Sequence, residues 1–170
     1  MSEPTFDAIK KEIFIEADLY QVWRAIAYPT DFGAWFGMAF ESPEFVVGQM
    51  ARGRIVPTSV NDVIAARQKP YEGLPFEILI RERLEPHRFQ FQWHPFAVEK
   101  GRDYSNEPMT RVRFDLHEIE GSVRLTVTES GFDNLFEDRR HAAYKAEDGG
   151  WSIQMSLISA YITRGSLAAS

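Results

Sequence analysis

The chain has 170 residues, a net charge of −6, 44% hydrophobic residues and no cysteine. The lack of cysteine excludes disulfides, thiol nucleophiles and thiolate metal sites, and the negative charge argues against a surface that binds duplex nucleic acid. This length and composition predict a single domain over residues 1–170, with a core from about residue 9 to residue 164.

The N-terminal residues, "MSEPTFDAIKKEIF", have no apolar stretch of the kind found in a signal peptide. No other stretch is long and apolar enough to insert into a membrane. We therefore expect a cytoplasmic protein without membrane insertion.

The first elements are a strand and two short helices. A strand over residues 9–17 presents three isoleucines on one face, Ile9, Ile13 and Ile15. Asp18 and Gln21 have the spacing of a capping box, so a helix begins at Asp18. Its buried stripe is Leu19, Val22, Trp23 and Ile26. After a turn at Pro29, a second short helix with its cap at Thr30 carries Phe32, Trp35 and Phe36.

Most of the next eighty residues have the pattern of strands. We expect short strands over residues 44–47 and 51–56, and longer ones over residues 76–84 and 88–94, with a long connection at 61–75. Phe89, Phe91 and Trp93 share one face of the strand at 88–94. In the strand at 76–84, Glu82 falls among apolar residues on the inward face.

A hairpin follows, and it ends on a second carboxylate in an apolar position. Val112, Phe114 and Leu116 alternate before a turn at Glu120-Gly121, and the returning strand alternates Val123, Leu125 and Val127. The next position on that face is Glu129. A buried carboxylate without a partner costs several kcal/mol, so we expect Glu129 at the rim of the interior, with a donor from Arg139, Arg140 or Trp151.

The remaining residues, 133–164, have the pattern of a helix with Asp133 as its cap. Gly149-Gly150 predicts a kink or a break. The first half of the helix presents mostly small residues on one face, Leu135, Arg139, Ala142, Ala146 and Gly149, and the second half a buried stripe of Trp151, Met155, Ile158 and Ile162. A small-residue face opposite an aromatic sheet implies close packing or empty space.

The sequence resembles the SRPBCC (START-like, helix-grip) superfamily, in the branch of homologues of the activator of the heat-shock protein 90 ATPase. The resemblance runs from about residue 9 to residue 162. It is carried by "IFIEADLYQVWRAIAYPTDFGAWF", "LEPHRFQFQW", "TRVRFDLHEIEGSVRLTVTESGF" and "GGWSIQMSLISAYI". It implies an α+β fold in which a curved antiparallel sheet of six or seven strands wraps around the long C-terminal helix. It also implies a cavity between the two, which superfamily members use for hydrophobic molecules or close altogether.

The inward aromatic residues and Glu129 form the predicted ligand site: Trp35, Phe89, Phe91, Trp93, Phe114, Glu129 and Trp151. Each aromatic side chain taken alone is more simply explained as core. Glu129 and Glu82 are candidate catalytic residues, although structural pairs perturb buried carboxylates in the same way as active sites do. The four histidines are dispersed and no metal or cofactor motif is present, so we predict neither.

These features favour a domain that binds a small hydrophobic molecule. A co-chaperone-like domain that binds a protein partner is an alternative, and an enzyme of the cyclase, dehydratase or hydrolase type that uses a pocket carboxylate is another.

Overall fold

The computed structural model describes residues 8–97 and 101–169. Within them it has seven strands and four α-helices, in the order β1 (Ala8–Ile15), α1 (Leu19–Ala27), α2 (Pro29–Phe36), β2 (Met38–Phe40), β3 (Met50–Ile55), α3 (Asp62–Gln68), β4 (Pro75–Leu84), β5 (Arg88–Trp93), β6 (Thr110–Ile119), β7 (Ser122–Ser130) and α4 (Glu137–Ala169). Single turns of 3-10 helix follow α3 and β7, at Lys69–Tyr71 and Phe132–Asn134.

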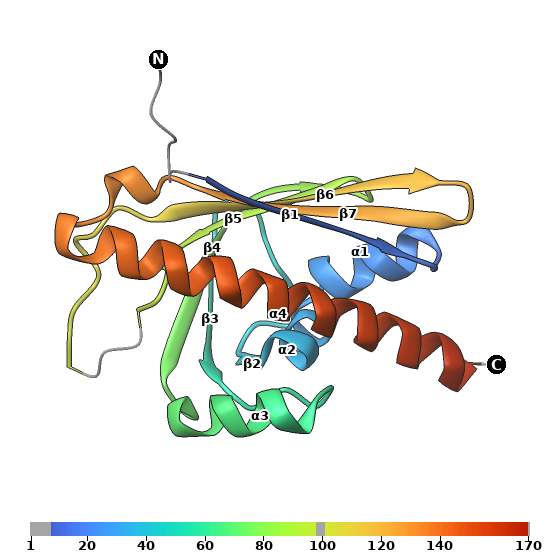
Figure 1. The fold of residues 1–170 in the computed structure, drawn as a ribbon, viewed down its shortest axis with the longest axis horizontal. Coiled ribbons are helices and arrows are strands. Elements are labelled where there is room, and N and C mark those ends of the chain that lie inside the picture. Colours follow the sequence, from blue (N-terminus) through green and yellow to red (C-terminus); the bar gives the residue numbers. More distant parts are fainter. Residues whose placement is uncertain (1–7, 98–100, 170) are drawn as a thin grey trace, which may run out of the picture.

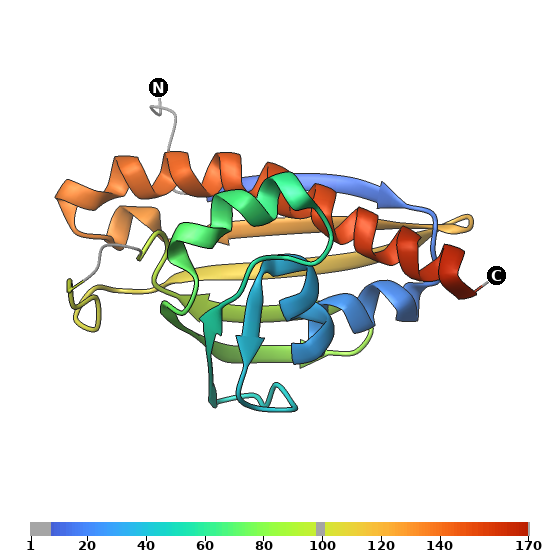
Figure 2. The ribbon, with the colours of Figure 1, turned by 90° about the horizontal axis from the view of Figure 1, so that it is seen from below.

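The seven strands form one curved antiparallel sheet in the order β1-β7-β6-β5-β4-β3-β2. α4 runs along one face of this sheet, and α1 and α2 lie on the same side (Figure 1, Figure 2). The expected α+β fold is confirmed, including the two short helices after the first strand and the long C-terminal helix. Because all three helices cover one face, the side chains that alternate toward that face make the core.

The hairpin of β6 and β7 has the predicted register. Phe114 pairs with Val127 and Leu116 with Leu125, and these side chains are buried. Its turn is at Glu120-Gly121, where φ is 37° and 85°. Glycine adopts such positive angles without strain, which explains its place in this turn.

The first two helices begin and end at recognisable signals. The N–H of Asp18 donates to Oε1 of Gln21 at 2.9 Å, which confirms the capping box. The second cap differs from the prediction, because α2 begins at Pro29 rather than after Thr30. α2 ends at Gly37, whose φ of 98° is left-handed. In the middle of α2, Gly33 packs so closely on the carbonyl group of Met38 that a methyl group would overlap its oxygen.

α4 is one continuous helix from Glu137 to Ala169, so the predicted break at Gly149-Gly150 is wrong. Trp151 and Met155 on one side of the glycines and Ala143 on the other are buried. Packing of both halves on the sheet therefore outweighs the cost of two glycines, about 2 kcal/mol. The helix also begins later than predicted, because Asp133 belongs to the preceding 3-10 turn.

The connections after α2 differ most from the expected elements. The predicted strand over residues 44–47 is absent, and a short strand lies earlier instead, at β2. The long connection contains α3, whose first turn is capped by Asn61 through its Oδ1 and the N–H of Ile64 (3.0 Å).

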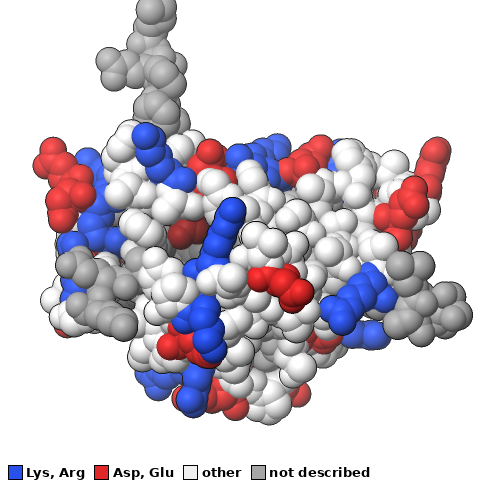
Figure 3. All heavy atoms as spheres, turned by 60° about the horizontal axis from the view of Figure 1, so that its bottom comes forward, with Lys and Arg blue, Asp and Glu red and all other residues white. Residues whose placement is uncertain are grey.

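Charged side chains are mixed on the face of the molecule that carries α3. Figure 3 shows acidic and basic residues interspersed there among uncharged surface. Within residues 8–97 and 101–169, no helix combines the length and the apolar character needed to cross a membrane.

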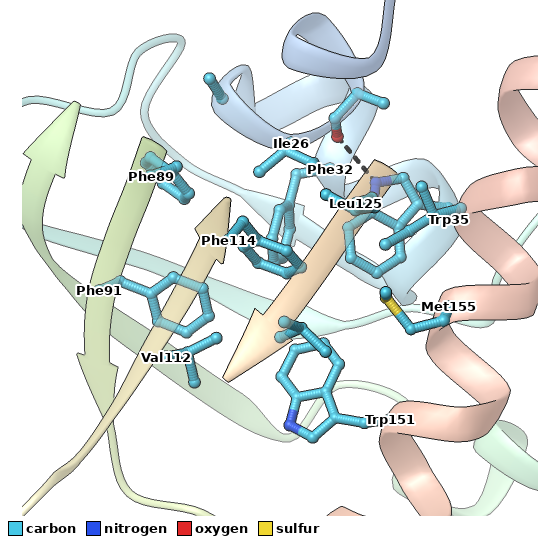
Figure 4. Close-up of a cluster of buried hydrophobic side chains, with 14 of the residues drawn as sticks. Ile26, Phe32, Trp35, Phe89, Phe91, Val112, Phe114, Leu125, Trp151 and Met155 are labelled. Atoms are coloured by element: carbon cyan, nitrogen blue, oxygen red, sulfur yellow. Dashed lines mark hydrogen bonds between the residues drawn. The ribbon is translucent and has the colours of Figure 1, made fainter. Parts of the chain in front are cut away.

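The core is dominated by aromatic rings between the sheet and the helices (Figure 4). Phe32 of α2 lies 6.0 Å from Phe91 of β5, ring centre to ring centre, and Phe45 stacks on Phe89 at 5.4 Å. The Trp35 indole N–H donates to the carbonyl of Ala25 at 2.7 Å. The space over the middle of the sheet is therefore filled by side chains from α2 and from the segment that follows β2.

We predict opposite effects for two glycine-to-alanine changes. Gly33→Ala should lower the free energy of unfolding by about 1–3 kcal/mol, because the methyl group overpacks the Met38 carbonyl. Gly149→Ala should raise it by about 0.5–1 kcal/mol, because nothing lies within 4 Å of the added carbon and alanine favours the helix. Chemical denaturation of both variants tests this. A Gly33→Ala protein as stable as the parent would contradict the close packing of α2.

Candidate functional site

The candidate site centres on Glu129, which takes a core position at the end of β7 and has 0% exposure. Its Oε2 accepts hydrogen bonds from the Trp93 indole N–H (2.8 Å) and the Thr110 hydroxyl (2.6 Å). Its Oε1 accepts one from the Trp151 indole N–H (2.8 Å). The donors come from β5, β6 and α4, so this carboxylate joins three strands to the helix that covers them.

The prediction that Glu129 points inward with Trp151 as a donor is confirmed. Its predicted place at the rim is wrong, because Glu129 has no exposed surface and its carboxylate is enclosed by Trp93, Thr110 and Trp151. The two arginines bond elsewhere. Arg139 pairs with Glu107, and the Nε of Arg140 donates to the carbonyl of Leu135.

A second carboxyl group, that of Glu147 in α4, is hydrogen-bonded to Glu129. The Glu147 residue is partly buried, but its carboxyl group points inward, where its Oε1 also accepts the N–H of Phe96 at 3.1 Å. Two carboxyl groups can share a hydrogen bond only if one of them carries a proton.

Burial raises the pKa of Glu147 well above that of an ordinary glutamate, and the neighbouring charge of Glu129 raises it further. Burial also raises the pKa of Glu129, while the hydrogen bonds from Thr110, Trp93 and Trp151 oppose that rise. The donors around Glu129 stabilise its charged form, so the shared proton resides on Glu147. We call Glu129 and Glu147 the carboxyl pair.

A buried ion pair holds the loop beside the carboxyl pair. Arg139 donates from Nη2 to Oε1 of Glu107 at 2.7 Å, and both side chains are almost fully buried. Arg139 also donates to the carbonyls of Pro95 (2.6 Å) and Phe96 (2.9 Å). Glu107 in turn accepts the N–H of Phe136 just before α4 (3.1 Å). These bonds fix the segment after β5 against the start of the helix.

Next to the carboxyl pair is a cavity of about 340 Å³ between α4, the first residues of β4 and the segment after β5. We call it the helix–sheet cavity. Glu147 and Gln154 contribute polar groups to its wall. Six aromatic side chains also line it, Phe36, Tyr71, Phe76, Trp93, Phe96 and Trp151.

A neighbouring hollow of about 500 Å³ shares Phe76, His94 and Ala97 with the helix–sheet cavity. Its wall is more polar and includes the exposed ion pair of Arg52 and Glu77, 3.1 Å apart. The helix–sheet cavity is the better candidate for an apolar occupant, because it combines an aromatic wall with a few polar groups.

Only some of the aromatic residues predicted for the ligand site line this cavity. Trp93 and Trp151 are in its wall, and Glu129 lies behind them as their hydrogen-bond acceptor. The other four, Trp35, Phe89, Phe91 and Phe114, are packed in the core and do not line the cavity (Figure 4). The expectation that these four border the cavity is wrong, because rings such as Phe32 and Phe45 occupy the space over β5.

The predicted inward position of Glu82 is also wrong. β4 has a bulge between Ile80 and Glu82, so that Ile80 pairs with Phe91 but Glu82 pairs with Gln90. The extra residue moves Glu82 to the outer face. There its Oε1 accepts a hydrogen bond from Gln90 at 2.9 Å, far from the interior that a catalytic role would require.

Glu107, Thr110 and Glu147 were not predicted as parts of the site, and Arg139 was expected to bond to Glu129 rather than to Glu107. Along α4 the inward row is Arg139, Ala143, Glu147, Trp151 and Met155, at a spacing of four. The sequence suggested a row through Ala142 and Ala146 instead. Ala142 is exposed, so the suggested row is displaced there by one residue from the inward row, which contains Ala143. Counting back in fours from Trp151 would have identified Glu147 as a residue facing the sheet.

The histidines do not form a site with the other polar residues. His94 donates from Nε2 to the carbonyl of Glu107 at 2.9 Å, since a carbonyl can only accept. In the described part of the chain, no group of three or more His, Cys, Asp or Glu residues is placed to hold a metal ion.

Glu129→Gln should lower the free energy of unfolding by about 1–3 kcal/mol, because the new amide N–H groups would face the N–H and O–H donors that now point at the carboxylate. Chemical denaturation measures this. Glu82→Gln is a matched control on the outer face, and it should stay within about 0.5 kcal/mol of the parent. Equal losses in the two variants would show that Glu129 is not an anchor.

The carboxyl pair should make stability depend on pH. The raised pKa of Glu147 means that the folded protein keeps a proton that the unfolded chain releases above about pH 4.5. This stabilisation is complete below that pH and is lost as the pH rises through the folded-state pKa, with a slope of at most about 1.4 kcal/mol per pH unit for one proton. Glu147→Gln should therefore become more stable relative to the parent as the pH increases. Glu137→Gln, at an exposed position of the same helix, should follow the parent curve.

Comparison with known proteins identifies the family. Residues 16–163 match the family described as Activator of Hsp90 ATPase homolog 1-like protein. A search of curated proteins gives no significant match.

Solved structures share the fold at low sequence identity. DynU16, a protein from the dynemicin biosynthetic locus, has a TM-score of 0.65 and 19% identity over 94% of this chain, which spans only 48% of DynU16. Protein MLL2253 from Mesorhizobium loti has a TM-score of 0.67 and 16% identity, over 92% of this chain and 97% of its own. A protein from Arthrobacter aurescens has a TM-score of 0.71 and 17% identity, over 95% and 90%.

These TM-scores establish a common fold, and the family match covers nearly the whole folded chain. The resemblance inferred from the sequence is thereby confirmed. The chain belongs to the family of Activator of Hsp90 ATPase homolog 1-like proteins, within the SRPBCC superfamily of helix-grip folds.

Proposed function

We propose that this protein binds a small, largely apolar molecule in the helix–sheet cavity. The observation that carries the proposal is the combination of an aromatic wall with the inward-pointing carboxyl group of Glu147. Sites for small molecules are typically mainly apolar hollows of about 300–1,000 Å³ with a few polar groups that orient the ligand. At about 340 Å³ the helix–sheet cavity is at the small end of this range.

The wall is held in place before any ligand arrives. Trp93 and Trp151 are stacked, with ring centres 5.8 Å apart, and both indoles are fixed by Glu129. Pro95 and Phe96 are fixed by Arg139 and Glu147. A preorganised site loses less conformational entropy on binding, and this favours affinity for a small ligand.

Two other functions remain as alternatives. The family name suggests a chaperone of the Hsp90 type as a protein partner. The other alternative is an enzyme that uses the carboxyl pair as its acid and base. Recovery of a bound compound in chemically altered form would reveal such an activity. DynU16, which shares the fold, comes from a biosynthetic locus, and this agrees with a small-molecule occupant.

Filling the helix–sheet cavity should abolish binding without unfolding the protein. Gly150 of α4 lines the cavity and has no atom within 4 Å of an added Cβ. Gly150→Leu should therefore place a side chain in the cavity while favouring the helix. Suitable probes are phenylbutanol, phenylbutylamine and phenylbutyrate, which carry similar apolar groups. A probe at one hundred times its Kd should raise the Tm of the parent by roughly 5–10 °C, and Gly150→Leu should lose this shift.

Gly149→Leu is the matched control, because Gly149 is exposed on the same helix and also has free space around it. It should keep the full shift. If none of the three probes shifts the Tm of the parent, the proposed function is wrong and the protein-partner alternative is favoured. If a probe raises the Tm of the parent, of Gly150→Leu and of Gly149→Leu equally, it binds outside the helix–sheet cavity.

A further inference from the structure

The carboxyl pair places two acidic groups beside the helix–sheet cavity, and the described side chains of its wall supply no counter-ion. Burial raises the pKa of both groups, so each holds a proton more strongly unless a cation lies nearby. Arg139, the cation that acts on Glu147, is engaged by Glu107 at 2.7 Å. Among the described residues that line the cavity, none is a lysine or an arginine. A buried charge without a counter-ion is costly, and a ligand of opposite charge would reduce that cost.

The aromatic wall has the same preference. Six aromatic side chains line the cavity, and the faces of such rings attract cations, indole most strongly. Two of the six are the indoles of Trp93 and Trp151. An anionic ligand would meet both the ring faces and the carboxyl group of Glu147 with unfavourable electrostatics.

A further polar group in the wall is an acceptor without a donor. The side-chain oxygen of Gln154 is buried and has no hydrogen-bond partner in the described part of the chain. The orientation of the Gln154 amide group is fixed, because its nitrogen donates to the carbonyl of Phe36 at 3.4 Å and a carbonyl can only accept. Gln154 lies on the same helix as Glu147, seven residues or about two turns further on. The spare hydrogen-bonding capacity of these two residues is for a donor.

We propose that the helix–sheet cavity selects a hydrophobic amine in its protonated form. The ammonium group donates to the carboxylate of Glu147, which releases the shared proton to solvent as the cation binds, because a nearby opposite charge favours the ionised carboxyl group. The ammonium group also lies against the indole faces, and the apolar part of the ligand fills the rest of the aromatic wall. This inference rests on the proposed function and specifies the chemical class of the occupant. Hydrogen bonds between an ammonium group and a carboxyl group are stronger than those of a neutral hydroxyl group, so the head group sets the affinity.

The test compares the three head groups on similar phenylalkyl skeletons. The Kd values of phenylbutylamine, phenylbutanol and phenylbutyrate are measured by tryptophan fluorescence at pH 7, where Trp93 and Trp151 of the cavity report on binding. We expect the amine to bind at least about tenfold more tightly than the alcohol, and the acid to bind more weakly than either. Glu147→Gln should remove most of the advantage of the amine and leave the affinity for the alcohol within about twofold.

Glu137→Gln removes the same kind of group from an exposed position of α4 and should keep the full preference. If the alcohol binds as tightly as the amine, the inference is overturned and the proposed function stands. The same holds if Glu147→Gln keeps the amine preference, since Glu147 would then not be the recognising group. If no probe binds, both are overturned.

Discussion

The structure depends on the carboxylate of Glu129, which is buried between the sheet and α4. A carboxylate in such a place costs several kcal/mol unless donors surround it. Here the donors are Trp93, Thr110 and Trp151, and the proton of Glu147 completes the set. Because these groups come from β5, β6 and α4, satisfying one charge determines how the helix lies on the sheet. A polar interaction thus orients the two indoles that give the helix–sheet cavity its apolar surface.

The buried ion pair has a different role from the carboxyl pair. Arg139 and Glu107 neutralise each other and use their remaining capacity on the backbone of Pro95, Phe96 and Phe136. Removing one partner of such a pair typically costs about 3–5 kcal/mol, so the loop wall stays in place. The carboxyl pair, by contrast, has no counter-ion among the described residues that line the helix–sheet cavity, and Glu147 faces that volume. The chain therefore separates the charges that hold the wall from the acidic group that a ligand can meet.

Much of the fold could be predicted from the sequence, and much of the site could not. The alternation of Val123, Leu125 and Val127 is regular, so the inward direction of Glu129 followed directly. Alanine and glycine occur on both buried and exposed faces, so they gave the wrong phase for the first half of α4, and Glu147 was missed. Glu107 lies in a polar loop without periodicity, where no pattern distinguishes a buried residue from an exposed one.

The filled core over the centre of the sheet could not be predicted from local patterns either. Phe89 and Phe91 point inward as predicted, but the rings that cover them, Phe32 and Phe45, come from other parts of the chain. Phe45 lies in a segment that was expected to be a strand. Whether aromatic residues surround a space or fill it depends on such distant segments, and no local pattern contains that information.

The bulge in β4 has a consequence for the opposite end of the sheet from the cavity. Its extra residue turns Glu82 outward and Arg83 inward, opposite Phe89. Arg83 then donates from Nη2 to the carbonyl of Ala27 at 3.2 Å, at the end of α1, where a helix favours a cation. If the same residues paired with β5 without the bulge, Glu82 would lie opposite Phe89 and would bring a carboxylate to the carbonyl end of α1. At this end of the molecule, a shift of one residue in strand pairing decides the sign of the charge that meets a helix.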